Sequence, residues 1–99
     1  MGTKLGLSVL SNMGGAGNGS NVTIGEGGLY QYLVHGTFSG TTAKLQTLGP
    51  DGTNFIDVPN SSMSAAGALN VELPSGSVVR GVLTAGTPTA MYASLGFVR

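Results

Sequence analysis

Short apolar runs, broken by glycine and proline, are the feature of this sequence that most restricts its fold. From Leu29 onward such runs recur at intervals of roughly 8–14 residues, a spacing typical of β-sandwiches and barrels that leaves almost no room for helices. We therefore predict strands near residues 4–10, 21–25, 29–38, 43–48, 54–58, 68–73, 77–84 and 90–98. The predicted fold is all-β: a single small antiparallel β-sandwich, or a tulip-like or jelly-roll-like barrel, of about 7–8 strands.

Residues 11–21 differ from the rest of the chain, because apart from Met13 and Ala16 they consist of Gly, Asn and Ser. Glycine reaches positive φ without strain, and Asn and Ser side chains bond to their own backbone. Such a segment is typical of a surface loop, or of an arm that orders against a neighbouring subunit. We therefore divide the chain into residues 1–27, an N-terminal strand with this loop or arm, and residues 28–99, a β-sandwich domain.

Two tetrapeptides share one turn chemistry. Residues 49–52, Gly-Pro-Asp-Gly, and residues 73–76, Leu-Pro-Ser-Gly, each place Pro second and Gly fourth. The φ angle of Pro is already fixed at the value that the second position of a β-turn requires. Both segments therefore predict hairpins, and turn formation accounts for Asp51 better than metal binding or catalysis does.

The strands fall into two kinds by the pattern of their side chains. Residues 68–73, Ala-Leu-Asn-Val-Glu-Leu, alternate strictly, which predicts one buried and one solvated face. Residues 29–34, 78–83 and 91–98 instead carry large apolar side chains on both faces. Since only one face can pack against the opposite sheet, a loop, an arm or a second subunit must cover the other. We predict subunit contacts there, at Leu29, Leu33, Val78, Val82 and Tyr92.

Composition supports this dependence on other chains. Charged residues make up 8% of the 99 residues, against ~25% in an average domain, and cysteine is absent. A domain of this size buries a modest share of its surface and gains from reinforcement. Disulfides are excluded, and His35 is the sole imidazole, whereas a structural zinc site takes about four nitrogen or sulfur ligands. Association of subunits remains as the source of reinforcement.

The charge balance bears on partners. The formal net charge is zero, which argues against nucleic acid and against an anionic membrane. No apolar run approaches the ~20 residues that span a bilayer. The glycines of residues 14–19 lack the following helix and the Lys-Ser/Thr pair of a phosphate-binding loop. We therefore expect no nucleic acid, membrane or cofactor as a partner.

No constellation of side chains indicates catalysis. Nucleophilic catalysis needs a Ser, Cys or Thr beside a base, and His35 lies within a predicted strand rather than in a catalytic loop. The carboxylates are few and scattered, and a domain this small offers little cleft between its sheets. We predict that the protein is not an enzyme and has no catalytic, cofactor-binding or metal-binding residues.

Three blocks of sequence between Gly36 and Leu95 carry a resemblance to a known family. They are Gly-Thr-Phe-Ser-Gly-Thr-Thr-Ala-Lys-Leu-Gln at residues 36–46, Gly-Pro-Asp-Gly-Thr-Asn-Phe-Ile-Asp-Val at residues 49–58, and Leu-Asn-Val-Glu-Leu-Pro-Ser-Gly-Ser-Val-Val-Arg-Gly-Val-Leu at residues 69–83. In this order the blocks resemble small virion proteins of tailed bacteriophages, namely capsid decoration (cement) and head-fibre proteins.

The resemblance implies a β-sandwich or tulip-like barrel that assembles as a homotrimer near local threefold positions of the capsid. It also implies the major capsid protein as partner, and a location on the capsid surface of the virion after synthesis in the host cytoplasm. On this hypothesis the work of the protein is binding energy: it binds the outer surface of the capsid and stabilises it through many contacts.

The alternative is a carbohydrate-binding or receptor-binding β module of a tail fibre or head fibre. Loops such as residues 59–67 and 85–89 would then arrange polar groups around a sugar. This alternative calls for exposed aromatic residues on loops, whereas the aromatic residues here fall in predicted strands.

Overall fold

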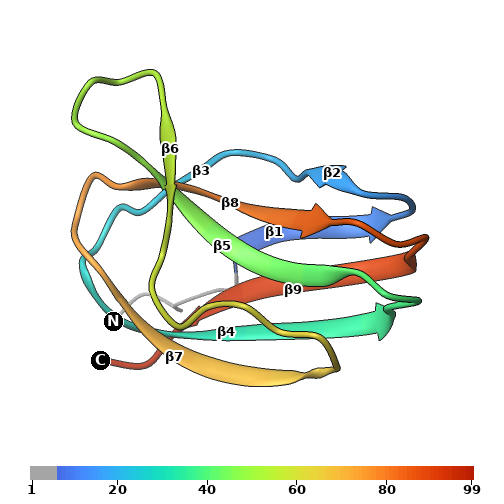
Figure 1. Cartoon of the computed structure of the whole chain (residues 1–99). Helices are drawn as coiled ribbons and strands as arrows, with labels where there is room; N and C mark the ends of the chain where they lie inside the picture. Colours follow the sequence, from blue (N-terminus) through green and yellow to red (C-terminus); the bar gives the residue numbers. More distant parts are fainter. Residues whose placement is uncertain (1–6) are drawn as a thin grey trace.

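The computed structural model describes residues 7–99, and within them the chain forms strands and no helix (Figure 1). The strands are β1 (Leu7–Met13), β2 (Gly17–Asn18), β3 (Val22–Thr23), β4 (Gly28–Thr37), β5 (Thr42–Leu48), β6 (Phe55–Asp57), β7 (Gly67–Leu73), β8 (Val78–Thr84) and β9 (Thr89–Phe97). The predicted all-β fold is therefore confirmed. None of the described residues belongs to a helix long and apolar enough to cross a membrane. The part of the predicted strand 4–10 that precedes Leu7 lies outside the described residues.

Two antiparallel sheets pack against each other. Sheet A has the order β1-β9-β4-β7, and sheet B has the order β2-β8-β5-β6, with β3 also paired to β8. The chain changes sheet at every connection except β2–β3 and β5–β6. With β2 and β3 counted as one interrupted strand, each sheet has four strands, as in a jelly roll.

The core lies between the sheets and follows the alternation of the strands. Along β7, Val71 and Leu73 are buried while Asn70 and Glu72 are exposed, so the two faces predicted for this strand are confirmed. The core contains fifteen apolar side chains from both sheets and their connections: Val9, Leu10, Ile24, Tyr30, Tyr32, Val34, Ala43, Leu45, Val71, Leu73, Val79, Leu83, Met91, Ala93 and Leu95.

The first predicted hairpin is present. The turn at residues 49–52 joins β5 to β6, and Gly52 N donates to Gly49 O at 3.0 Å. Asp51 Oδ1 accepts hydrogen bonds from Thr53 N at 3.0 Å and from Asn54 N at 3.1 Å. These bonds hold the pKa of the Asp51 carboxyl below its usual value. The turn role of Asp51 is therefore confirmed.

The hairpin predicted at residues 73–76 is wrong, because β7 belongs to sheet A and β8 to sheet B. Leu73 is still paired with Gly28 in the ladder, so the turn begins one residue later, and Ser77 N donates to Pro74 O at 3.2 Å. Gly76 is then the third turn residue, with φ 86°, where a glycine avoids strain. The turn carries the chain between the sheets.

The glycine-rich segment 11–21, expected as a loop or arm, is held against the sandwich. Its first residues complete β1, and β2 pairs with β8. Beyond β2, Gly19 N donates to Gly81 O in β8 at 2.7 Å. Residues 7–27 therefore belong to the same sandwich as residues 28–99.

Close packing of β1 against β8 depends on glycine. The pairing of β1 with β9 shifts register between Ser8 and Leu10, and this bulge buries both Val9 and Leu10, at 0% and 2% exposure. A Cβ on Gly81 would lie 2.8 Å from Leu10 Cγ, and a Cβ on Gly19 would overlap the Val9 carbonyl oxygen. These two positions accept no side chain unless β1 moves.

Candidate protein-binding face

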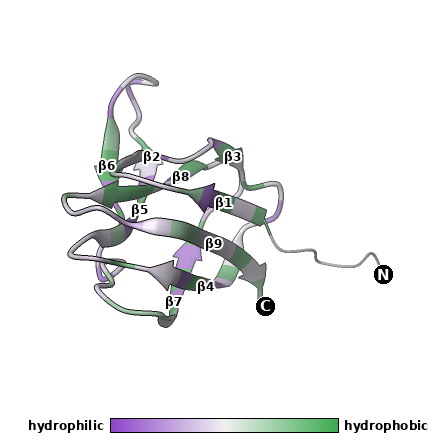
Figure 2. Ribbon diagram, turned by 90° about the vertical axis from the view of Figure 1, so that its right-hand side faces the viewer, coloured by the Kyte–Doolittle hydropathy of each residue, from purple (hydrophilic) through white to green (hydrophobic). Residues whose placement is uncertain are grey.

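The outer side of sheet A gathers the side chains that do not enter the core. Figure 2 shows β1, β9 and β4 side by side in this layer. Because alternate residues of each strand are buried, the residues between them point outward. We call this set the A face: Ser8, Leu29, Gln31, Leu33, His35, Ala68, Asn70, Glu72, Tyr92, Ser94 and Gly96.

The centre of the A face lies where β4 and β9 pair. His35 is in register with Tyr92, and Leu33 with Ser94. The rings of His35 and Tyr92 stack, with centroids 5.1 Å apart and an interplanar angle of 15°. Leu33 is 43% exposed and Tyr92 is 39% exposed, so two large apolar side chains of this face contact solvent. They lie diagonally across the β4–β9 pair, because the direct partners are Ser94 for Leu33 and His35 for Tyr92.

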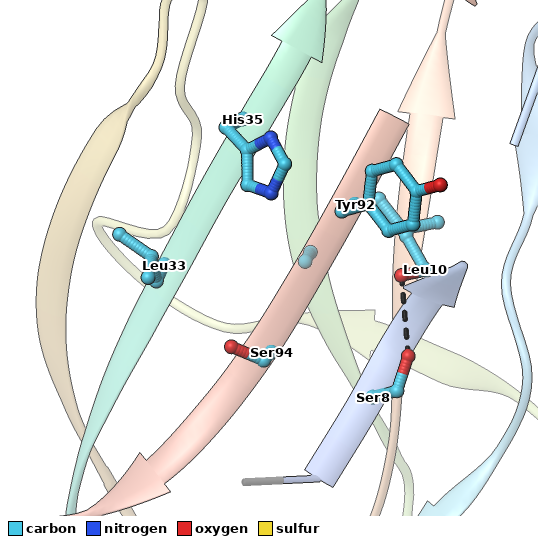
Figure 3. A pocket seen from close by; sticks show the side chains of 7 residues that line it. Ser8, Leu10, Leu33, His35, Tyr92 and Ser94 are labelled. Carbon is cyan, nitrogen blue, oxygen red and sulfur yellow. Dashed lines mark hydrogen bonds between the residues drawn. The ribbon is translucent and has the colours of Figure 1, made fainter. Parts of the chain in front are cut away.

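A depression of about 230 Å³ lies beside this centre (Figure 3). It is below the ~300 Å³ at which small-molecule pockets begin. One of its hydroxyls is engaged within the chain, since Ser8 Oγ donates to Leu10 O at 3.2 Å. A hollow of this size, lined by both apolar and polar side chains, suits the insertion of a side chain from another protein. The lining residues are Ser8, Leu10, Leu33, His35, Tyr92, Ala93 and Ser94.

Charge is nearly absent from sheet A. Its four strands contain one Asp, Glu, Lys or Arg residue, Glu72, and this residue lies on the edge strand β7. Depletion of charge at the centre, with exposed aromatic and aliphatic side chains, is the composition that distinguishes the core of protein interfaces from the rest of a surface.

The outer side of sheet B has the opposite character, because its polar side chains bind one another. Lys44 Nζ lies 3.1 Å from Asp57 Oδ2, and Gln46 Nε2 donates to Asp57 Oδ1 at 2.8 Å. The bond from Gln46, and then that from Lys44, hold the pKa of Asp57 below its usual value. Arg80 donates through Nε and Nη2 to Gln46 Oε1, at 3.0 and 2.9 Å, and its Cζ lies 3.9 Å from the ring centroid of Phe55. This surface is covered by its own network.

The residues predicted as subunit contacts divide between the two sheets. Leu29, Leu33 and Tyr92 all lie on the A face, with Leu29 half-buried. Val78 and Val82 lie on the outer side of β8 in sheet B, where Val78 is half-buried. Val82 is 6% exposed, in register with Lys44 of β5, and therefore offers little surface to a partner. The structure gathers three of the five residues and separates the other two from them.

His35 is part of the A face, although the sequence analysis considered it as a zinc ligand and as a catalytic base and not as a contact residue. The available signal was strand parity, because His35 is an even number of residues from Leu29 and Leu33 and must point to the same side. Within residues 7–99, His35 has no hydrogen bond to a serine or carboxylate, and no group of three or more His, Cys, Asp or Glu could hold a metal ion. The arrangement provides ring stacking and apolar contact.

The A face is therefore the described surface best suited to contact with another protein. Comparisons of the chain with models of protein families, with curated protein sequences and with solved structures found no match.

Proposed function

We propose that the protein is a structural virion protein, a capsid decoration or cement protein of a tailed bacteriophage. It binds the major capsid protein on the outer surface of the capsid as a homotrimer and stabilises the shell. The observation that carries the protein-binding role is the A face, which has exposed Leu33 and Tyr92 and one charged residue, Glu72, on its edge strand. The virion role is supported by the resemblance of residues 36–46, 49–58 and 69–83 to that family.

The fold is compatible with this role but does not distinguish it from the carbohydrate-binding alternative. Jelly rolls build viral capsid domains and also lectin domains, so the choice depends on the surface. On the lectin alternative, residues 59–67 and 85–89 would hold the sugar, yet neither segment contains an aromatic residue. Ser61 in the first segment is buried and bonded to the backbone of Leu45. The feature that favours a sugar is the exposed Tyr92 beside the depression.

The size of the A face favours attachment through several copies. Four strands about 4.8 Å apart, each with about seven residues of ~3.3 Å, give an area of about 440 Å². A stable interface buries about 800 Å² on each partner, so one A face alone binds weakly. Linked copies bind the same shell far more tightly than one copy does, which agrees with a trimer.

Light scattering followed by cosedimentation with capsids of its phage that lack the protein tests this function. We expect a trimer, or a multiple of it, that cosediments with the shell. Leu33→Asp puts a charge at the centre of the A face and abolishes cosedimentation at an unchanged melting temperature. Thr53→Asp, at an exposed position of the β5–β6 turn, is the matched control and retains binding.

Two results would contradict the proposal. A stable monomer with no affinity for the shell would remove the structural role. Binding to a glycan array that is lost in Tyr92→Ser, without any binding to capsids, would establish the carbohydrate-binding alternative instead.

A further inference from the structure

The strand β7 forms an edge of sheet A and is paired on one side. Its seven pairs with β4 run from Gly28–Leu73 to Val34–Gly67 without a register shift. Within residues 7–99, no backbone hydrogen bond reaches its other side. A regular strand with one unpaired side is a template for the addition of another strand.

The hydrogen bonds of β4 show which groups of β7 are unpaired. Leu29 N donates to Arg99 O at 2.7 Å, and Leu29 O accepts from Val98 N at 2.8 Å, so the backbone of Leu29 faces away from β7. In an antiparallel pair such residues alternate with hydrogen-bonded ones. The partner of Leu29, Glu72, therefore directs its N–H and C=O outward, and so do Asn70 and Ala68. All three residues are exposed.

The other sheet edges in residues 7–99 are protected against strand addition. The pairing of β1 shifts register twice, and its Asn12 has φ 47°. Strands β2 and β3 have two residues each, and β6 has three. Bulges and short edge strands are the means by which sheet proteins prevent edge pairing. Strand β7 has neither.

We propose that β7 pairs antiparallel with β7 of a second copy of this chain, about a two-fold axis at Asn70. Asn70 then faces Asn70 of the partner subunit, and Ala68 faces Glu72 of the partner subunit. The two-fold axis also pairs Glu72 with Ala68 of the partner subunit, which gives three pairs in all. In each pair the unpaired N–H and C=O groups of the two residues point at each other and form two hydrogen bonds. The two A faces continue into one surface.

Self-complementarity identifies a second copy as the occupant. A two-fold axis at Asn70 uses all three outward-facing residues of each β7. An axis at Leu69 or Val71 pairs only two of them, because the third would meet Ala66 beyond the strand or Pro74, which has no N–H. Glu72 is the one charged residue of β7, and at this register it meets Ala68 rather than a second carboxylate.

The pairing extends the homo-oligomer part of the proposed function. It is argued from the β7 edge of this chain and does not depend on the virion role. The joined A faces cover about 880 Å², twice the ~440 Å² of one copy, and so reach the ~800 Å² of a stable interface. A two-fold contact also links two trimers as readily as two monomers.

Charge variants of the full chain, measured by sedimentation velocity over a concentration series, test the register. Ala68→Glu places two like-charged pairs across the axis and weakens self-association about tenfold, whereas Ala68→Lys strengthens it. The double variant Ala68→Glu with Glu72→Lys restores association. Within one copy these two positions lie about 13 Å apart, so their charges pair only between copies.

Backbone and cross-linking variants test the same contact independently. Asn70→Pro removes an N–H that β4 does not use and halves the mass of the assembly, while Asn70→Thr retains it. The chain has no cysteine, and Asn70→Cys brings two thiols onto residues with Cα atoms about 5.5 Å apart, within disulfide range. Oxidation therefore links Asn70→Cys into dimers and leaves the exposed control Thr53→Cys unlinked.

Three results would overturn the pairing. These are equal effects of Ala68→Glu and Ala68→Lys, an unchanged mass in Asn70→Pro, or equal cross-linking of Asn70→Cys and Thr53→Cys. If Asn70→Pro loses capsid binding at an unchanged mass, the edge holds a strand of the capsid protein instead. If only the virion role is wrong, the wild-type chain will not cosediment with capsids, but the variants of β7 will still show the changes in mass described above.

Discussion

Replacement of Gly81 by alanine tests how the sandwich closes around β1. Gly81 is buried in β8, opposite Leu45 of β5, and faces the bulge of β1. The added Cβ would lie 2.8 Å from Leu10 Cγ and 3.2 Å from Val9 O. Leu10 Cγ is a branch point and Val9 O is backbone, so neither moves aside without a shift of the strand. We expect β1 to be displaced from the core.

The magnitude follows from two opposing effects. Overpacking of a core costs about 1–3 kcal/mol. Alanine in a strand recovers about 0.5–1 kcal/mol relative to glycine, because the unfolded chain loses freedom. The free energy of unfolding of Gly81→Ala therefore falls by about 1 kcal/mol, and by at most about 2.5 kcal/mol. In a domain of about 100 residues, a fall of about 1 kcal/mol lowers the melting temperature by about 4–8 °C.

Gly96 in β9 provides the matched control. A Cβ at Gly96 would have no other atom within 4 Å, so Gly96→Ala gains the same backbone effect without a clash. Thermal unfolding followed by circular dichroism should show a rise of a few degrees for Gly96→Ala. Combining Gly81→Ala with Leu10→Ala should be less destabilising than the sum of the two changes, because both act on one contact. A melting temperature of Gly81→Ala at or above that of Gly96→Ala would refute this packing.

Three further predictions concern buried polar groups and titration. Ser61→Ala leaves the Leu45 N–H without its partner at 3.1 Å and should lower the unfolding free energy by about 1–3 kcal/mol in urea titrations. Tyr32 has no hydrogen-bond partner for its hydroxyl among the described residues, and burial raises its pKa. Tyr32→Phe should therefore stabilise the fold by about 1 kcal/mol and remove the part of the stability loss above about pH 10 that we expect from ionisation of this tyrosine in the unfolded chain. The pKa of Asp51 is lowered, so its stabilising bonds persist above about pH 4 and disappear as the pH falls through the lowered value, which an NMR titration of the Thr53 amide follows.

Local chemistry in the sequence predicted the features that depend on one strand or one turn. The alternation of residues 68–73 fixed which side chains of β7 are buried, and Pro50 with Asp51 identified the β5–β6 hairpin. The turn at residues 73–76 shows where this reasoning ends. A turn motif states that the chain reverses, whereas the sheet that receives the next strand depends on partners far away in sequence.

The A face could be predicted in part for the same reason. Large apolar residues on both sides of a strand indicate that both sides are covered, but they do not say by what. Val82 is covered within its own chain, whereas Leu33 remains 43% exposed. The bulge that buries Val9 beside Leu10 interrupts the alternation from which we assign side chains to the two faces of a strand. No residue type near the bulge indicates this interruption in the sequence.

Hydroxyl-radical footprinting of the chain, free and bound to its capsid, measures most directly whether another protein covers the A face. Leu33 and Tyr92 are 43% and 39% exposed in the single chain, and Ile56, which is 54% exposed, belongs to β6 of sheet B and lies outside this face. We expect labelling of Leu33 and Tyr92 to fall sharply in the assembly while labelling of Ile56 is retained. Undiminished labelling of Leu33 and Tyr92 in the capsid-bound protein would contradict the assignment of the A face as the binding surface.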